Sequence, residues 1–211
     1  MPEPVLVVTL LAAGASRRLG VPKQLVTIDG VPLLRRQALM ALAASIGPVV
    51  VIVGSREDLC RDVIVDLPMD IRVNTRWAEG MASSLREATA AGREHQAAAL
   101  MTLPYDLDRL IASDLRRLHR VWSDADDIAC LARFDGHLGP PAIIPSRLFP
   151  RLEMLVGDVG ARSIVKSRGE SVREVDLARA AFDIDHPEDL AGLGDQRAVR
   201  EVLRSRIADL A

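Results

Sequence analysis

Apolar runs alternate with amphipathic segments along this chain of 211 residues. Continuous runs of Val, Leu, Ile and Ala predict buried strands at residues 5–11, 49–53 and 97–103. Shorter strands are expected at residues 25–28, 70–74, 128–133, 142–144, 172–175 and 181–185. Helical spacing predicts helices at residues 33–45, 81–91, 113–123, 148–155, 161–168 and 195–211. Two more helices are expected, one capped by Ser55 and one opened by Pro187.

The alternation of strands and helices predicts an α/β fold, with one domain over residues 1–211. Its core is expected to be a mostly parallel, doubly wound sheet with helices on both faces. Ligands of such sheets bind beyond the carboxyl ends of the strands, near the point where the strand order reverses. We therefore expect the functional site in the loops that follow the strands.

The composition narrows the function classes. A net charge of −2 argues against binding to nucleic acid or to a membrane surface. Cys60 and Cys130 stand far apart outside any metal-ligand pattern, so they are expected to be reduced thiols. The sequence starts without a basic leader, and its apolar runs are too short to span a membrane, so the cytoplasm is the expected location.

The loop after the first strand carries the strongest chemical signal. Residues 12–16, Ala-Ala-Gly-Ala-Ser, have small side chains, so successive N–H groups can form a concave anion site. Arg17, Arg18 and Lys23 follow closely, and guanidinium and ammonium groups both bind phosphate. This pattern indicates a polyphosphate site. The alternative is an ordinary strand–loop–helix connection with solvated basic residues. The loop matches neither the P-loop nor the dinucleotide-binding fingerprint.

Residues 11–20, LAAGASRRLG, and residues 22–25, PKQL, resemble the LAAGxSxRMGxPKxL signature of the MobA-like nucleotidyltransferases. They are most similar to the molybdenum cofactor cytidylyltransferase branch, because the guanylyl branch usually has two glycines where Ala12-Ala13-Gly14 stand. The resemblance implies a Rossmann-like nucleotidyltransferase fold. It also implies catalytic roles for Arg18 and Lys23, and nucleotide contacts in this segment from Leu11, Ala12, Ala13, Gly14, Ser16, Arg18 and Lys23.

A second motif, residues 74–84, follows a strand and opens a helix. Its amides, Asn74 and its two serines can read the edge of a nucleobase. The alternative is a loop in which a serine caps the helix and Trp77 packs. The cytidylyltransferases carry a similar N-x-x-W-x-x-G-x-x-x-S segment, and this match implies nucleotide contacts from Asn74, Gly80 and Ser84.

Thr102 marks the main departure from the family. There the strand ends in a D-x-P pattern whose aspartate binds the catalytic magnesium, and Thr102 occupies that position here. A neutral hydroxyl is a weaker magnesium ligand than a carboxylate. Thr102 is therefore expected to limit the metal site, and Thr102→Asp to raise magnesium affinity. Asp106 and Asp108 can substitute through a shifted loop, or they can cap or solvate the next helix.

Residues 157–162, Gly-Asp-Val-Gly-Ala-Arg, match the family's G-D-x-G-A-R segment, which faces the second substrate. The match implies acceptor contacts from Gly157, Asp158, Gly160 and Arg162. Without the family, Asp158 reads as a helix cap and Arg162 as a solvated side chain.

Residues 183–189 match the family's D-I-D-T-P-E-D segment, with His186 in place of Thr. Strand alternation would place Asp183 and Asp185 on one side, where paired carboxylates suit a hard cation. We expect these two residues to bind Mg²⁺. Capping of the following helix explains Asp185 equally well.

These motifs indicate a magnesium-dependent nucleotidyltransferase. The resemblance implies CTP as donor and molybdenum-bearing molybdopterin as acceptor, with a molybdoenzyme or its maturation chaperone as a further partner. Two alternatives stay open. One is the same chemistry on a sugar or polyol phosphate. The other is a non-catalytic protein that binds or delivers the cofactor, which Thr102 favours.

Overall fold

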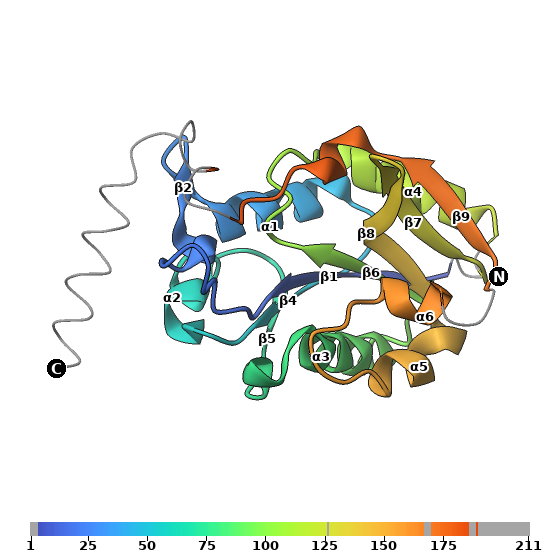
Figure 1. Cartoon of the computed structure of the whole chain (residues 1–211), viewed down its shortest axis with the longest axis horizontal. Coiled ribbons are helices and arrows are strands. Elements are labelled where there is room, and N and C mark those ends of the chain that lie inside the picture. Colours follow the sequence, from blue (N-terminus) through green and yellow to red (C-terminus); the bar gives the residue numbers. More distant parts are fainter. Residues whose placement is uncertain (1–3, 126, 167–169, 186–188, 190–211) are drawn as a thin grey trace, which may run out of the picture.

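The structure is a computed structural model that describes residues 4–125, 127–166, 170–185 and 189. A central sheet runs through the middle of the molecule, with helices above and below it (Figure 1). The helix expected after Pro187 and the helix expected at residues 195–211 lie outside the described residues.

The central sheet has seven strands in the order β5-β4-β1-β6-β8-β7-β9. All neighbours are parallel except β8, which runs antiparallel to β6 and β7. The prediction of a mostly parallel sheet is confirmed. The strands span Leu6–Ala12 (β1), Val49–Val53 (β4), Asp70–Val73 (β5), Ala99–Pro104 (β6), Ala129–Phe134 (β7), His137–Pro145 (β8) and Val172–Asp176 (β9). A separate two-stranded ribbon pairs β2, Thr27–Ile28, with β3, Val31–Pro32.

The helices divide between the two faces, as expected for a doubly wound sheet. One apolar cluster joins the sheet to α1 (Leu33–Ala44), α2 (Glu57–Asp62) and α4 (Ala112–Ser123). The other joins it to α3 (Met81–Glu94), α5 (Phe149–Glu153) and α6 (Arg162–Lys166). Among the described residues, no helix is both long and apolar enough to cross a membrane.

Strand β1 shows why a run without polar interruption forms the centre of the sheet. Leu6, Val8 and Leu10 join the cluster under α1 and α4, while Val7 joins the cluster under α3. Alternate side chains therefore pack against opposite layers. All four are at most 1% exposed, and burying each such side chain stabilises the fold by roughly 1.5–3 kcal/mol.

The reversal of strand order locates the expected crevice. The chain passes from β1 to β4 and β5 on one side, then returns to β6 on the other side of β1. The loops after β1 and β6 therefore leave the sheet side by side at its carboxyl edge, where α/β proteins bind ligands.

Three local expectations were wrong. The strand expected at residues 25–28 begins instead as a 3-10 turn, Lys23–Leu25, whose residues are all buried. Arg56, in a left-handed conformation, and not Ser55, is the N-cap of α2. The strand expected at residues 181–185 is absent from the described chain, where a 3-10 turn, Ala178–Ala181, leads into extended backbone. That backbone bonds through Ile184 N–H to the Asp106 carbonyl, at 3.3 Å, which ties it to the loop after β6.

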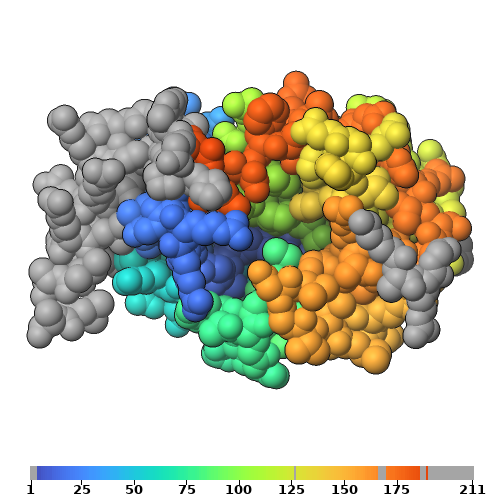
Figure 2. Space-filling model, in the orientation of Figure 1, coloured from blue at the N-terminus to red at the C-terminus, as the bar shows by residue number. Residues whose placement is uncertain are grey.

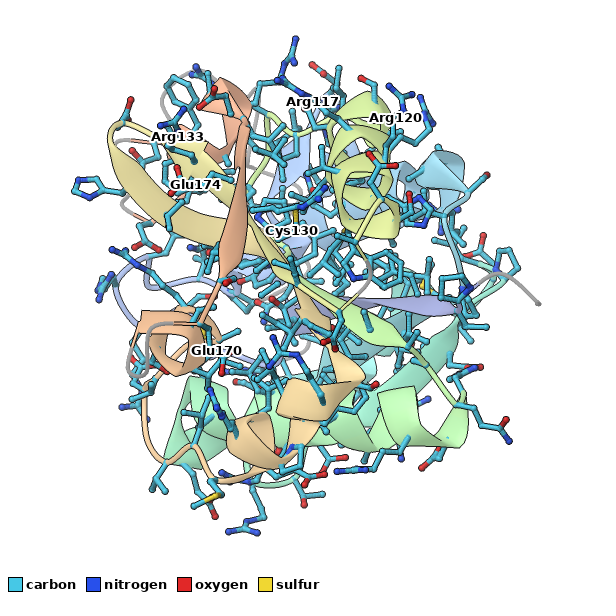
Figure 3. The ribbon with its side chains drawn as sticks, turned by 90° about the vertical axis from the view of Figure 1, so that its right-hand side faces the viewer. Arg117, Arg120, Cys130, Arg133, Glu170 and Glu174 are labelled. Atoms are coloured by element: carbon cyan, nitrogen blue, oxygen red, sulfur yellow. The ribbon has the colours of Figure 1, made fainter. Side chains whose placement is uncertain are left out.

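At the far edge of the sheet, β9 lies along β7 and carries charged side chains (Figure 3). Arg133 of β7 bonds to Asp176 at 2.7 Å and lies 3.5 Å from Glu174. Charged edges of this kind discourage pairing with another chain. Cys130 lies buried beneath this edge, and burial raises the pKa of its thiol to about 11.

Candidate functional site

A cavity of about 560 Å³ opens at the carboxyl edge between β1 and β6. In Figure 2 the hollow lies between the blue N-terminal loop, the green segment near residue 80 and the orange segment near residue 158. Its walls come from six parts of the chain: Leu11 and Ala13–Leu19, Lys23, Trp77–Met81 with Ser84, Pro104–Asp106, Asp158, and Asp185. The sequence motifs therefore meet in one place, although more than 170 residues separate the first from the last.

The loop after β1 offers a row of unused donors to this cavity. Within the described part of the chain, the backbone N–H groups of residues 14–17 find no hydrogen-bond acceptor. Gly14 is exposed, and the Ser16 φ angle of 51° is left-handed. Consecutive free N–H groups in such a loop form a concave anion site. The geometry fits the predicted polyphosphate cradle.

Lys23 lies at the centre of the charged groups. Its Nζ donates to Asp185 Oδ1 at 2.6 Å and to Asp106 Oδ2 at 2.9 Å, with only 6% of the side chain exposed. Burial alone would lower the pKa of Lys23, but the two carboxylates outweigh it and raise the pKa above its ordinary value. Lys23 is therefore a buried, charged ammonium that bridges two carboxylates.

Arg18 reaches the same carboxylate from the solvent side. Its Nη1 lies 2.8 Å from Asp185 Oδ2, and its side chain is 71% exposed. Arg17 also lines the cavity. The cavity wall thus combines three cations with four carboxylates, because Glu79 and Asp158 line it together with Asp106 and Asp185. Such a wall suits a metal–polyphosphate group better than a bare anion.

Asn74 has a structural role in this site. It is 1% exposed, and its Nδ2 donates to Ser83 Oγ at 2.7 Å and to Ser84 Oγ at 3.0 Å. It holds the start of α3 in place, whereas the expected nucleotide contact would need a free polar edge in the cavity. Ser84 and Gly80 do line the cavity. Ala12, another expected nucleotide contact, does not line the cavity, because it is fully buried at the end of β1.

Of the four residues predicted to contact the acceptor, only Asp158 lines the cavity. Asp158 accepts a long hydrogen bond of 3.4 Å from the Met81 N–H. Gly157, Gly160 and Arg162 do not line the cavity. A Cβ on Gly80 would come within 2.6 Å of the Gly157 backbone, so the lack of a side chain at Gly80 lets the two segments touch. Arg162 Nε is buried and has no hydrogen-bond partner among the described residues.

The structure corrects the expected metal residues. Thr102 is 3% exposed within β6, and its hydroxyl donates to the Ala142 carbonyl of β8 at 3.3 Å. It lies two residues before Pro104, where the cavity wall begins on this strand, and does not line the cavity. Asp106, beyond Pro104, supplies the carboxylate on this side.

Asp183 and Asp185 do not share a strand face. Asp185 lines the cavity, while Asp183 is exposed outside its wall. Partial burial and the charges of Asp185 and Asp106 raise the pKa of Asp183. Partial burial likewise raises the pKa of Asp108, which lies outside the cavity wall. Asp106 and Asp185 thus form the carboxylate pair that meets at Lys23, and Asp183 and Asp108 lie outside the cavity wall.

Tyr105 and Gln24 are residues of the site that sequence reasoning missed. Tyr105 Oη lies 3.2 Å from Ser16 Oγ, and burial raises the pKa of its phenol. Gln24 is 1% exposed behind the loop after β1. The only signal for either was its position, Tyr105 beside Pro104 and Gln24 beside Lys23.

Comparisons with known proteins show the family and the fold. Residues 8–173 match the family model of the MobA-like NTP transferase domain. The chain is similar to Rv0371c from Mycobacterium tuberculosis H37Rv, with 26% identity, a TM-score of 0.78, and coverage of 92% of this chain and 98% of that chain. A manganese complex of Rv0371c gives 24% identity, a TM-score of 0.73, and coverage of 90% and 97%.

The fold is also similar to 4-diphosphocytidyl-2C-methyl-D-erythritol synthase from Anaerococcus prevotii DSM 20548. That match has 13% identity, a TM-score of 0.70, and coverage of 90% of this chain and 97% of that chain. No curated protein sequence matches the chain.

Proposed function

Because the chain belongs to the MobA-like NTP transferase family, we propose that it transfers CMP from CTP to a phosphate-bearing acceptor and releases pyrophosphate. The single observation that carries this proposal is the row of free N–H groups at residues 14–17, close to the buried Lys23 ammonium. Donors on a fixed loop and a desolvated cation suit a reaction whose main requirement is neutralising phosphate charge.

The reaction needs no covalent intermediate on the protein. A phosphate oxygen of the acceptor forms a bond to the α-phosphorus of CTP. The bond from that phosphorus to the bridging oxygen breaks, and the electron pair leaves with pyrophosphate. The free N–H groups of residues 14–17 bind the β- and γ-phosphates. Lys23 and Arg18 neutralise the charge that grows on the leaving group.

Asp106 and Asp185 fit a divalent cation, which we take to be Mg²⁺. Their oxygens already share one buried cation, the Lys23 ammonium, at 2.9 and 2.6 Å. Mg²⁺ is typically held by one or two carboxylates together with substrate phosphates and water. Among the described residues, no three His, Cys, Asp or Glu side chains are grouped to hold a metal alone. When bound, the ion would neutralise phosphate charge. The manganese complex of Rv0371c supports a divalent metal in this fold.

The choice of CTP rests on Ala13. Ala13 lines the cavity and is 4% exposed, and a Cβ on Gly54 would lie 2.8 Å from the Ala13 methyl group and 2.7 Å from Trp77 Cβ. The wall is therefore close-packed here, with less room for a purine than a second glycine would leave. CTP is expected to bind more tightly than GTP. Equal or inverted dissociation constants would refute the base assignment alone.

A molybdopterin-type compound is the acceptor that the family resemblance favours, with a molybdoenzyme or its chaperone receiving the product. Asp158, beside the exposed Met81, is the cavity residue from the predicted acceptor segment. The delivery alternative rested on Thr102, and the Asp106 carboxylate beside Lys23 favours the transferase over it.

The experiment is a binding screen of the four nucleoside triphosphates with and without Mg²⁺, followed by pyrophosphate release with molybdopterin and with sugar or polyol phosphates. Lys23→Ala is expected to lower kcat by roughly 10²–10³-fold with a smaller effect on nucleotide binding. Pyrophosphate release with none of the acceptors, despite metal-dependent CTP binding, would leave a nucleotide-binding protein and contradict the transferase assignment.

A further inference from the structure

Gln24 does not itself line the cavity described above, yet its side chain bonds the backbone of the phosphate loop. Its side-chain nitrogen donates to the carbonyl oxygen of Ala12 at 2.9 Å and to that of Gly14 at 2.7 Å. A primary amide has two N–H hydrogens, so each carbonyl can take one. The side chain is 1% exposed, and solvent therefore does not compete for these bonds.

The carbonyl of Ala13, which lies between those of Ala12 and Gly14, is also hydrogen-bonded. The Ser55 N–H, at the start of the loop after β4, donates to the Ala13 carbonyl at 2.9 Å. Carbonyls 12, 13 and 14 are thus all bound by groups of the protein. In a trans peptide plane the N–H points opposite to the C=O. The N–H groups of residues 13–15 must therefore point away from Gln24 and Ser55.

We propose that Gln24 is a positioning residue that aims the loop N–H groups at the triphosphate. This inference rests on the proposed nucleotide site. Without a donor behind the loop, the Gly14 carbonyl can turn toward the cavity, where its partial negative charge repels phosphate. Gly14 has little steric resistance to such a peptide flip. Gln24 prevents it by bonding the carbonyl on the buried side.

Gln24 also links the loop to the catalytic lysine. Its Oε1 lies 3.4 Å from Ser16 Oγ, which accepts the Lys23 N–H at 3.0 Å and lies 3.2 Å from Tyr105 Oη. The loop donors and the backbone of Lys23 are therefore fixed by one set of side chains. Binding of phosphate needs no rearrangement of these groups, which is the benefit of preorganisation.

The test compares Gln24→Met, which keeps the length of the side chain and removes both donors, with Gln37→Met. Gln37 is a matched control, because it is also 1% exposed but lies on α1, outside the cavity wall. Dissociation constants are measured for CTP with Mg²⁺, for inorganic pyrophosphate and for cytidine, which carries no phosphate. Urea unfolding monitors stability.

Gln24→Met is expected to weaken CTP and pyrophosphate binding at least tenfold and to leave cytidine binding unchanged, whereas Gln37→Met changes none of the three. Unchanged CTP binding, or an equal loss of CTP and cytidine binding, overturns the positioning role. If the wild-type protein itself binds neither CTP nor pyrophosphate, the proposed function fails together with this inference.

A second measurement on the wild-type protein covers the case in which Gln24→Met does not fold. Amide NMR spectra are recorded with and without inorganic pyrophosphate. The N–H signals of Gly14 and Ala15 should shift, and the side-chain amide of Gln24 should stay protected from hydrogen exchange in both states. Rapid exchange of the Gln24 amide in the free protein would overturn the proposal.

Discussion

Replacing Lys23 with Met should increase the affinity of the nucleotide-free protein for a divalent cation, although it removes a catalytic group. The Lys23 ammonium lies between the same two carboxylates, Asp106 and Asp185, that we assign to the metal. A metal ion that binds before the nucleotide must therefore displace it. Met has a similar length and keeps the buried stem packed without its charge.

The expected gain in metal affinity can be estimated from the solvent exposure of the ion-paired side chains. Removing one partner of a fully buried ion pair typically costs about 3–5 kcal/mol, whereas exposed pairs contribute about 1 kcal/mol or less. Here the side chains of Asp106 and Asp185 are 22% and 33% exposed, and that of Lys23 is 6% exposed. The free energy of their interaction is therefore intermediate between these two cases. A competition energy of about 1.4–2.8 kcal/mol corresponds to a gain in metal affinity of roughly 10- to 100-fold.

The assay is a Mn²⁺ titration of the nucleotide-free protein, with free Mn²⁺ measured by electron paramagnetic resonance. Arg72→Met serves as the control, because Arg72 pairs with Glu94 on the surface, away from the cavity. Tighter Mn²⁺ binding together with a lower kcat is the expected result. Unchanged or weaker binding in Lys23→Met, with wild-type behaviour in Arg72→Met, would refute the competition between ammonium and metal.

Three further outcomes are expected. Thr102→Asp should lower the free energy of unfolding by about 3 kcal/mol or more in urea and leave Mn²⁺ affinity unchanged, because the carboxylate would be buried against the Ala142 carbonyl. Gly80→Ala should cost about 1–3 kcal/mol in the same assay, since the φ angle of 103° and the Gly157 backbone at 2.6 Å both oppose a methyl group; a neutral effect would contradict that contact. Burial raises the pKa of the Cys60 thiol to about 12. The buried neutral thiol therefore stabilises the folded protein below the ordinary pKa of a thiol, and this stabilisation is lost as the pH rises from that value toward 12. Native protein at pH 8 should react with a thiol reagent at Cys60 only as fast as it unfolds.

The sheet could be predicted from sequence because burial on both faces leaves a clear signal. The run at residues 49–53 has the same bounds as β4, and helix α1 begins at Leu33 as its spacing predicts. These elements are specified by their own apolar side chains. The segment at residues 181–185 reads like a strand by the same pattern, but only Ile184 of its last three residues is buried.

Only part of the carboxylate pair could be predicted. Asp185 was an expected metal ligand, whereas Asp106 was one of two substitutes left open, because its place depends on where a strand ends in space. The motif places Thr102 where the family has its aspartate, but β6 continues to Pro104, and the Thr102 hydroxyl donates to the Ala142 carbonyl of β8. Asp106 reaches the cavity only because the loop beyond Pro104 bends toward Lys23. The role of Gln24 was hidden for a related reason, since its partners are backbone carbonyls with no signature in the sequence.

Anomalous diffraction from crystals grown with Mn²⁺ and a non-hydrolysable CTP analogue tests the central claim most directly. The account predicts a manganese peak in contact with Asp106, Asp185 and the phosphates, with the phosphate oxygens bonded to the N–H groups of residues 14–17. A manganese peak at Asp108 and Asp183, or phosphates bound away from this loop, would contradict it.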